Sequence, residues 1–145
     1  MLRRAGRERE KQRMRLEQLR ALAGPSRSLR EIVLDKELAA LGDALVNFAY
    51  SLALSLSEGR PRGGRLDNRL LSEAFRAAGL REEAPRRMSR HELADAAEAL
   101  LAYGWLMGMV SLQDIVDAMR KPDIITGLSA LLASLAEELR CSPRP

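Results

Sequence analysis

The stretch at residues 38–54 limits the fold of this chain more than any other; it reads LAALGDALVNFAYSLAL. It consists largely of apolar residues that form helices readily and it contains no proline, so it predicts a helix that is buried on at least one side. Asp43 lies near the middle of this stretch. Burying an ionised carboxylate costs several kcal/mol unless a cation or hydrogen bonds compensate for it. Asp43 is therefore either a capping or solvent-facing residue or part of a functional site.

Helical patterns also cover the rest of the chain, and no segment alternates polar and apolar residues as a strand does. Ser89 with Glu92, and Ser111 with Asp114, form capping-box patterns that mark two helix starts. The glycine-rich and proline-rich residues 58–65 (EGRPRGGR) predict a loop. The other expected helices lie at residues 29–34, 35–57, 66–78 and 124–139. The expected fold is an all-α, single-domain helical bundle.

The length of 145 residues suits one domain with a real core. We expect a basic helical arm at residues 1–24, the helical domain at 28–140 and a short tail at 141–145. Apolar runs are interrupted by polar residues short of membrane-spanning length, and the N-terminal residues have no apolar signal region, so we expect no membrane segment and a cytoplasmic protein. Cys141 is the only cysteine, which excludes an internal disulfide and a thiolate metal site.

Several kinds of active site are excluded by composition. His91 is the only histidine, so Ser-His-Asp or Cys-His catalysis and a polyhistidine metal site are not expected. Aromatic residues make up 3% of the chain, too few for a base-stacking platform. The loop at residues 58–65 lacks the Gly-Lys-Ser/Thr ending of a phosphate-binding loop. Carboxylates, hydroxyls and arginines remain for chemistry.

Positive charge is concentrated at the N-terminus. Residues 1–23 hold eight basic and three acidic side chains, a net charge of +5, whereas the whole chain carries +4. A basic arm on a nearly neutral body fits a polyanionic partner such as nucleic acid. A solvated helix stabilised by ion pairs within itself explains the same pattern equally well. Within the arm, the RNA-binding candidates are Arg3, Arg4 and Arg7.

Asp95 and Glu98 lie three residues apart, so a helix projects both from one face. Small apolar residues surround them, which indicates close packing against another helix. If that helix is the one carrying Asp43, three carboxylates meet at one point, and neither helix supplies an arginine beside them. Oxygen-only ligands of this kind favour Mg²⁺ or Mn²⁺. The alternative for Asp95 and Glu98 is an exposed helical pair.

These residues resemble the ribonuclease III catalytic domain. LGDALVNF, containing Asp43, is similar to the signature helix of that family, and DAAEAL, containing Asp95 and Glu98, is similar to its second motif, in the same order. The resemblance covers about residues 35–117. It implies that Asp43, Asp95 and Glu98 are the metal-binding and catalytic carboxylates of an Mg²⁺- or Mn²⁺-dependent endoribonuclease acting on structured or double-stranded RNA. No double-stranded-RNA-binding domain follows, so the compact Mini-III-like and archaeal ribonuclease III-like branch is expected.

Two positions depart from the family pattern. Many members carry a glutamate one turn before the signature aspartate, where this chain has Ala39, and Glu37 lies on another side of the helix. Many members also place a bulky aromatic three residues before that aspartate, where this chain has Ala40. The resemblance implies a homodimer through the same helices. The loss of an acid leaves open a non-catalytic scaffold that binds ribosomal or other structured RNA.

Further polar residues lie close to these motifs. Glu92 is explained by its capping box, although a ligand role is the alternative, and His91 fits a surface position better than a general base. Asn47, one turn after Asp43, either orients that carboxylate or is a plain surface residue. The loop arginines either contact phosphates or are solvated; they are Arg60, Arg62 and Arg65.

Overall fold

The computed structural model describes residues 2–25 and 27–141. The helices are α1 (Leu2–Leu22), α2 (Leu29–Val33), α3 (Lys36–Glu58), α4 (Asn68–Ala77), η1 (Arg81–Glu83, a 3-10 turn), α5 (Arg90–Leu106), α6 (Leu112–Met119) and α7 (Ile124–Cys141). No strand occurs within these two ranges, so the prediction of an all-α fold is confirmed. Of the expected tail, only Cys141 falls inside the described residues, as the last residue of α7.

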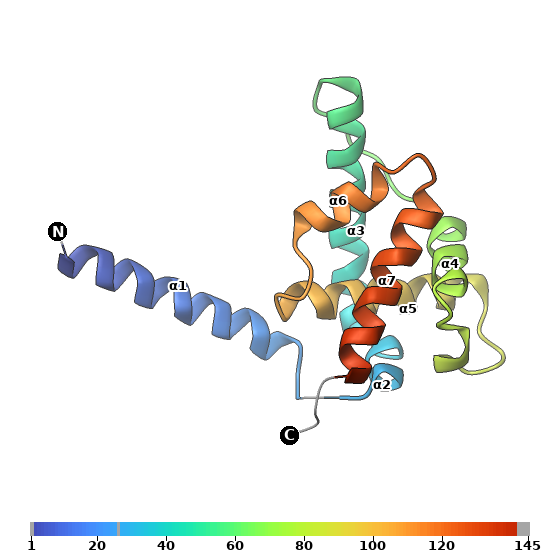
Figure 1. Ribbon diagram of the computed structural model, residues 1–145, viewed down its shortest axis with the longest axis horizontal. Coiled ribbons are helices and arrows are strands. Elements are labelled where there is room, and N and C mark those ends of the chain that lie inside the picture. The colour runs from blue at the N-terminus through green and yellow to red at the C-terminus, as the bar shows by residue number, and fades with distance from the viewer. Residues whose placement is uncertain (1, 26, 142–145) are drawn as a thin grey trace.

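Helix α5 is the centre of the bundle. It packs against α3 and α4 most extensively, and also against α2 and α7 (Figure 1). Its residues from Ala96 to Gly104 are all buried, and five of these are alanine or glycine. Small side chains let neighbouring helices approach α5 from several sides at once, which explains why this helix has no strongly polar face.

Local capping signals set the helix starts. Ser89 accepts a hydrogen bond from the Glu92 amide while Glu92 bonds back to Ser89, and Ser111 with Asp114 does the same. Asp35 accepts from the amides of Glu37 and Leu38 and so starts α3. These are the starts that the sequence predicted. Helix α3 ends at Gly59, whose φ of 73° is a left-handed conformation that glycine adopts without strain.

Helices α3 and α5 approach each other to backbone contact. A Cβ placed on Gly42 would overlap the backbone carbonyl of Glu98. The backbone of α3 therefore touches that of α5 at this crossing, next to Asp43. The lack of a side chain at position 42 is what brings the two carboxylate-bearing helices together.

Helix α1 extends away from the other helices (Figure 1). None of its residues is buried, and its side chains from Leu2 to Gln18 are all exposed. The arm that the sequence predicted is thus a continuous helix in this structure. Its basic side chains are free to meet a partner.

Helix α3 is unusually apolar for its length. Of the described helices, it alone is long and apolar enough to cross a membrane, with a mean hydropathy of 1.4. The expectation that every apolar stretch is too interrupted for this is wrong for α3. One such helix is weak evidence of a membrane span, because a core helix of a bundle passes the same test. Leu38, Val46 and Ala49 of α3 are buried in the core.

We predict that Gly42→Ala destabilises the fold. Alanine gains about 1 kcal/mol over glycine in helix propensity, but here its methyl group meets main-chain atoms of Glu98, which no side-chain rotation can clear. Overpacking of this kind costs about 1–3 kcal/mol, and a backbone contact places the cost at the upper end. Urea unfolding followed by circular dichroism measures the change.

The matched control is Gly6→Ala in α1, where an added Cβ meets nothing within 4 Å. That variant keeps or slightly raises the unfolding midpoint. Equal midpoints for Gly42→Ala and the wild type would contradict the close crossing of α3 and α5.

Candidate active site

The structure places the three predicted acids at the crossing of α3 and α5, with Glu98 near each of the two aspartates. Asp43 projects from α3, and Asp95 and Glu98 project from α5. Glu98 is 3% exposed, and its side chain lies within hydrogen-bonding reach of Asp43. The Asp43 and Asp95 side chains are 46% and 27% exposed. Glu98 thus forms the floor of the site, and the two aspartates lie nearer to solvent.

Burial and its neighbours change the acidity of Glu98. Desolvation is the largest cause, followed by the negative charges of Asp43 and Asp95, and together they raise the pKa of Glu98 from 4.5 to about 8, against the lowering effect of Arg65. A carboxyl group with this pKa is largely protonated at neutral pH. The buried Glu98 carboxyl group therefore carries a proton when no metal ion is bound beside it.

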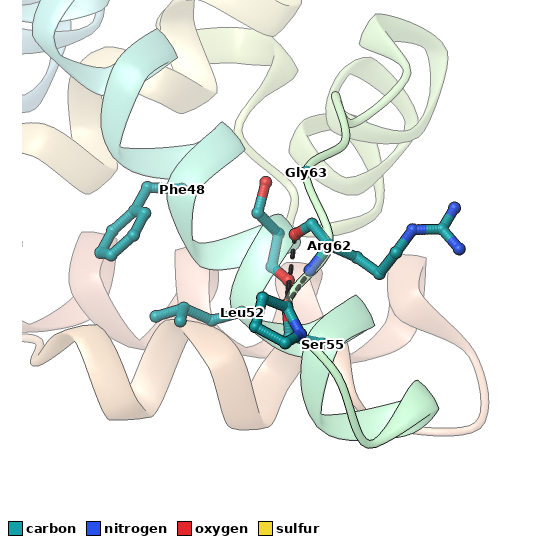
Figure 2. Close-up of a pocket in the computed structure, with 7 residues that line it drawn as sticks. Phe48, Leu52, Ser55, Arg62 and Gly63 are labelled. Atoms are coloured by element: carbon teal, nitrogen blue, oxygen red, sulfur yellow. Dashed lines mark hydrogen bonds between the residues drawn. The ribbon is translucent and has the colours of Figure 1, made fainter.

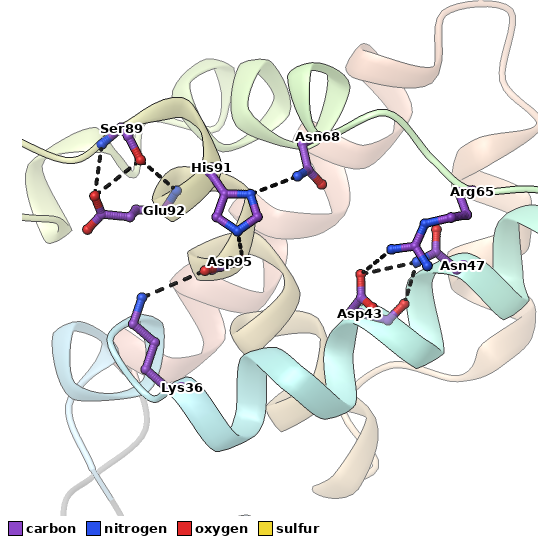
Figure 3. A network of polar contacts seen from close by, with 9 residues as sticks. All are labelled: Lys36, Asp43, Asn47, Arg65, Asn68, Ser89, His91, Glu92 and Asp95. Carbon is purple, nitrogen blue, oxygen red and sulfur yellow. Dashed lines mark hydrogen bonds and ion pairs between the residues drawn. The ribbon is translucent and has the colours of Figure 1, made fainter.

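Asp43 is held from two directions (Figure 3). The Asn47 side-chain amide donates to Oδ1 of Asp43 over 3.2 Å and to its backbone oxygen over 2.9 Å. Nη2 of Arg65 lies 3.3 Å from the same Oδ1. Of the two roles that the sequence left open for Asn47, the structure thus supports orientation of Asp43.

Asp95 has separate partners. Nζ of Lys36 lies 3.7 Å from its Oδ2, and Nε2 of His91 lies 3.9 Å from its Oδ1. His91 is exposed, and its other ring nitrogen is 3.0 Å from the Asn68 amide (Figure 3). The two helices supply no arginine beside the acids, as expected, but the sequence analysis did not predict the cations of Lys36 at the start of α3 and Arg65 in the loop.

A row of polar side chains along α3 fixes that loop. Asn47, Ser51 and Ser55 follow one another at four-residue intervals, so they lie on one side of the helix. Oδ1 of Asn47 accepts from the Leu66 amide over 2.9 Å, Oγ of Ser51 from Gly64 over 3.0 Å, and Oγ of Ser55 from Arg62 over 2.8 Å. These contacts place Arg65 beside Asp43.

The other candidate residues lie apart from the acids. Arg60 and Arg62 pair with Glu58, at 3.6 Å and 2.8 Å, so Arg65 is the loop arginine that reaches the site. Arg3, Arg4 and Arg7 lie on α1 and are exposed. Glu92 binds its own cap residue, which leaves its capping role as the explanation of that residue.

The match to known families agrees with this geometry. The family described as Ribonuclease III matches residues 36–138, which contain all three acids and the whole bundle from α3 onward. The chain belongs to the ribonuclease III family. A search of curated proteins finds no match to it. Ribonuclease III proteins cleave RNA and generally depend on divalent metal ions. Family membership therefore supports RNA as the substrate class and a divalent metal ion as the class of cofactor.

The ribonuclease III acids are not gathered into a finished metal site here. Among residues 2–25 and 27–141, no three Asp, Glu, His or Cys side chains surround one point closely enough to hold a metal ion. The donor chemistry nevertheless fits a hard divalent cation, because carboxylate oxygens from two helices converge on a buried carboxyl group whose ionised form lacks compensation. Ala39 is buried, and Glu37 lies in a hollow with Leu22 and Leu41, so Glu37 does not replace the missing acid.

We predict that Glu98 makes the stability of the metal-free protein depend on pH. The folded protein keeps a proton on Glu98 between pH 4.5 and about 8, whereas the unfolded chain loses it near 4.5. Since the folded state binds more protons in this window, stability falls as the pH rises through it. Each pKa unit corresponds to about 1.4 kcal/mol, so the loss reaches a few kcal/mol.

Urea unfolding in the presence of a chelator, at pH 5.5, 7 and 8.5, measures this dependence. Glu98→Gln removes most of it and raises stability at pH 8.5, because glutamine resembles the protonated glutamate without titrating. Glu37→Gln, at an exposed position on α3, is the control and retains the wild-type dependence. Parallel pH profiles for Glu98→Gln and the wild type would rule out the raised pKa of Glu98.

Proposed function

We propose that the protein is a metal-dependent endoribonuclease that hydrolyses phosphodiester bonds in structured or double-stranded RNA, and that it processes such RNA in the cytoplasm. The observation that carries this proposal is that Asp43 and Asp95 both lie near the buried Glu98 at the contact between α3 and α5. Ribosomal RNA is one structured RNA on which the enzyme would act.

Asp43, Asp95 and Glu98 would hold the metal, which is Mg²⁺ or Mn²⁺ by the chemistry of the ligands. When bound, such an ion supplies a water of lowered pKa and neutralises charge on the phosphodiester. The protein residues prepare this site: Asn47 fixes the direction of the Asp43 carboxylate, and Glu98 gives up its proton when a cation takes its place. The buried helix contact beneath Glu98 keeps these oxygens at fixed positions.

The arginines would bind the RNA backbone. A-form RNA is recognised mainly through its shape, phosphates and 2′-hydroxyls, because its major groove is too deep for side chains. Arg3, Arg4 and Arg7 on the projecting helix α1, with Arg60 and Arg62 on the loop, offer exposed positive charge at two separate places. Contacts of this kind weaken steeply with salt.

Incubation of the purified protein with a labelled RNA duplex and Mg²⁺ or Mn²⁺ tests the enzyme. We expect cleavage that falls at least about a hundredfold in Glu98→Ala, since removing an electrostatic group of a transition state costs factors of this size. Glu37→Gln keeps the wild-type rate. Binding without products from any duplex would indicate a non-catalytic scaffold, and no binding even at low salt would contradict a role with RNA.

We further propose that the protein acts as a homodimer through the exposed side of α3. Leu41, Phe48 and Leu56 lie on this helix with exposures of 40%, 56% and 53%. Phe48 and Leu52 also line a hollow of about 350 Å³ beside Arg62 and Gly63 (Figure 2). A second copy, related by a two-fold axis across α3, would cover both the apolar side chains and the hollow.

An aromatic residue is available for this contact although Ala40 replaces the one expected from the family. Phe48 follows Leu41 by seven residues, which places both on the same side of α3. Aromatic side chains, phenylalanine included, are enriched at protein–protein interfaces relative to the rest of the surface. Phe48 would thus take over the contact from the lost aromatic at another turn of the helix.

We predict that Phe48→Glu converts the dimer into a monomer, because it buries an unpaired charge at the centre of the contact. Sedimentation equilibrium at micromolar concentration measures the mass. Met14→Glu on α1, with a wild-type exposure of 55%, is the matched control and remains dimeric. A monomeric wild type, or a dimeric Phe48→Glu, would contradict this interface.

A further inference from the structure

The segment at residues 62–66 is hydrogen-bonded to α3 because the spacing of its amides matches the spacing of side chains along one side of the helix. Four helical residues rise about 6 Å, and two extended residues cover about 6.6 Å. Every fourth side chain of α3 can therefore bind every second amide of an extended segment, which is what Asn47, Ser51 and Ser55 do. Gly64 lies flat on α3, where an added Cβ would be 2.7 Å from Leu54 and 3.3 Å from Tyr50. The segment is thus held in one register.

Asp43 is the next member of the same row. It lies four residues before Asn47 and is where the fixed segment delivers the side chain of Arg65. Arg65 lies between Gly64 and Leu66, whose amides are hydrogen-bonded to α3. Its backbone is therefore fixed, although its side chain is 78% exposed. A guanidinium group in this position is always available to Asp43 and is free to leave it.

A divalent metal ion would need the same carboxylate. Oδ1 of Asp43 is 3.3 Å from the Arg65 guanidinium, and the charge of Arg65 also acts on Glu98. A divalent ion bound at this carboxylate and the Arg65 guanidinium would repel each other at such distances. Metal binding and the Arg65 contact therefore oppose each other.

We propose that Arg65 is a displaceable counter-cation of the acidic site: it holds Asp43 in the metal-free protein, yields that carboxylate to a divalent metal ion, and turns to a phosphate of the bound RNA. This inference rests on the proposed function and assigns Arg65 a positioning role within it. The Asn47, Ser51 and Ser55 contacts keep the released guanidinium beside the acids, where the phosphodiester has to lie. Guanidinium groups suit phosphate because they offer paired donors.

Titration of the metal-free protein with Mn²⁺ in a calorimeter tests the first half. Arg65→Gln removes the competitor, so we expect Mn²⁺ to bind about two- to fivefold more tightly at low salt, which is the range for an exposed ion pair. A merely structural role for Arg65 would weaken metal binding instead. Arg62→Gln is the matched control: it lies on the same loop and pairs with Glu58, so its Mn²⁺ affinity equals that of the wild type.

A double-mutant cycle tests whether the polar row acts through Arg65. Ser51→Ala loosens the segment and moves the Mn²⁺ affinity toward that of Arg65→Gln, whereas the double variant binds as Arg65→Gln does. Additive effects of the two substitutions would contradict the coupling.

The second half is tested by cleavage of duplex RNA at saturating Mn²⁺, where Arg65→Gln slows the reaction at least about tenfold despite full metal loading. An Arg65→Gln affinity for Mn²⁺ equal to or below that of the wild type, or absent in both, overturns the competition. An unchanged cleavage rate overturns the phosphate contact. If no duplex is cut by the wild type, the proposed nuclease function fails, and the Mn²⁺ titration still decides the competition for Asp43.

Discussion

The contact of Gly42 with the backbone of Glu98 is the constraint on which the rest of this structure depends. It lets α3 and α5 approach so closely that a carboxyl group is buried between them. Burial raises the pKa of Glu98 to about 8, which makes the ionised form unfavourable until a cation arrives. A glycine in a helix usually lowers stability, but here it is the condition for bringing acids from two helices together. Fold and site therefore share one contact.

The row Asp43, Asn47, Ser51 and Ser55 explains why an apolar helix carries an aspartate near its middle. One side of α3 is buried, another is exposed and apolar, and this third side binds an extended segment through side-chain hydrogen bonds. Asp43 stands at the end of the row that reaches α5. Its carboxylate is thus neither a core residue nor an ordinary surface residue, because it belongs to a polar seam that also determines where Arg65 lies.

Much of the fold could be predicted because its signals are local. Ser89 and Ser111 start helices through capping boxes four residues long, and the apolar periodicity of residues 124–139 gives α7. The site was predictable as a set of acids, since a motif places Asp95 and Glu98 on one face. Its counter-cations were not: Arg65 lies 22 residues from Asp43 and reaches it only through the register of the loop. The four-residue spacing of Asn47, Ser51 and Ser55 is visible in the sequence. Its role in binding residues 62–66 becomes clear only when that segment is seen to lie against α3.

A different group compensates the negative charge of each of the three acids, and this bears on the absence of a fourth acid at position 39. Asp43 has Arg65, Asp95 has Lys36, and Glu98 keeps a proton. The two amino-acid cations are 78% and 69% exposed, so each can be displaced at little cost. Position 39 is buried instead, with Ala39 7% exposed. A glutamate there would add a second buried carboxyl group to the one that already resists ionisation. Alanine at this position leaves the metal-free site without another uncompensated carboxyl group, but the site then has one metal ligand fewer.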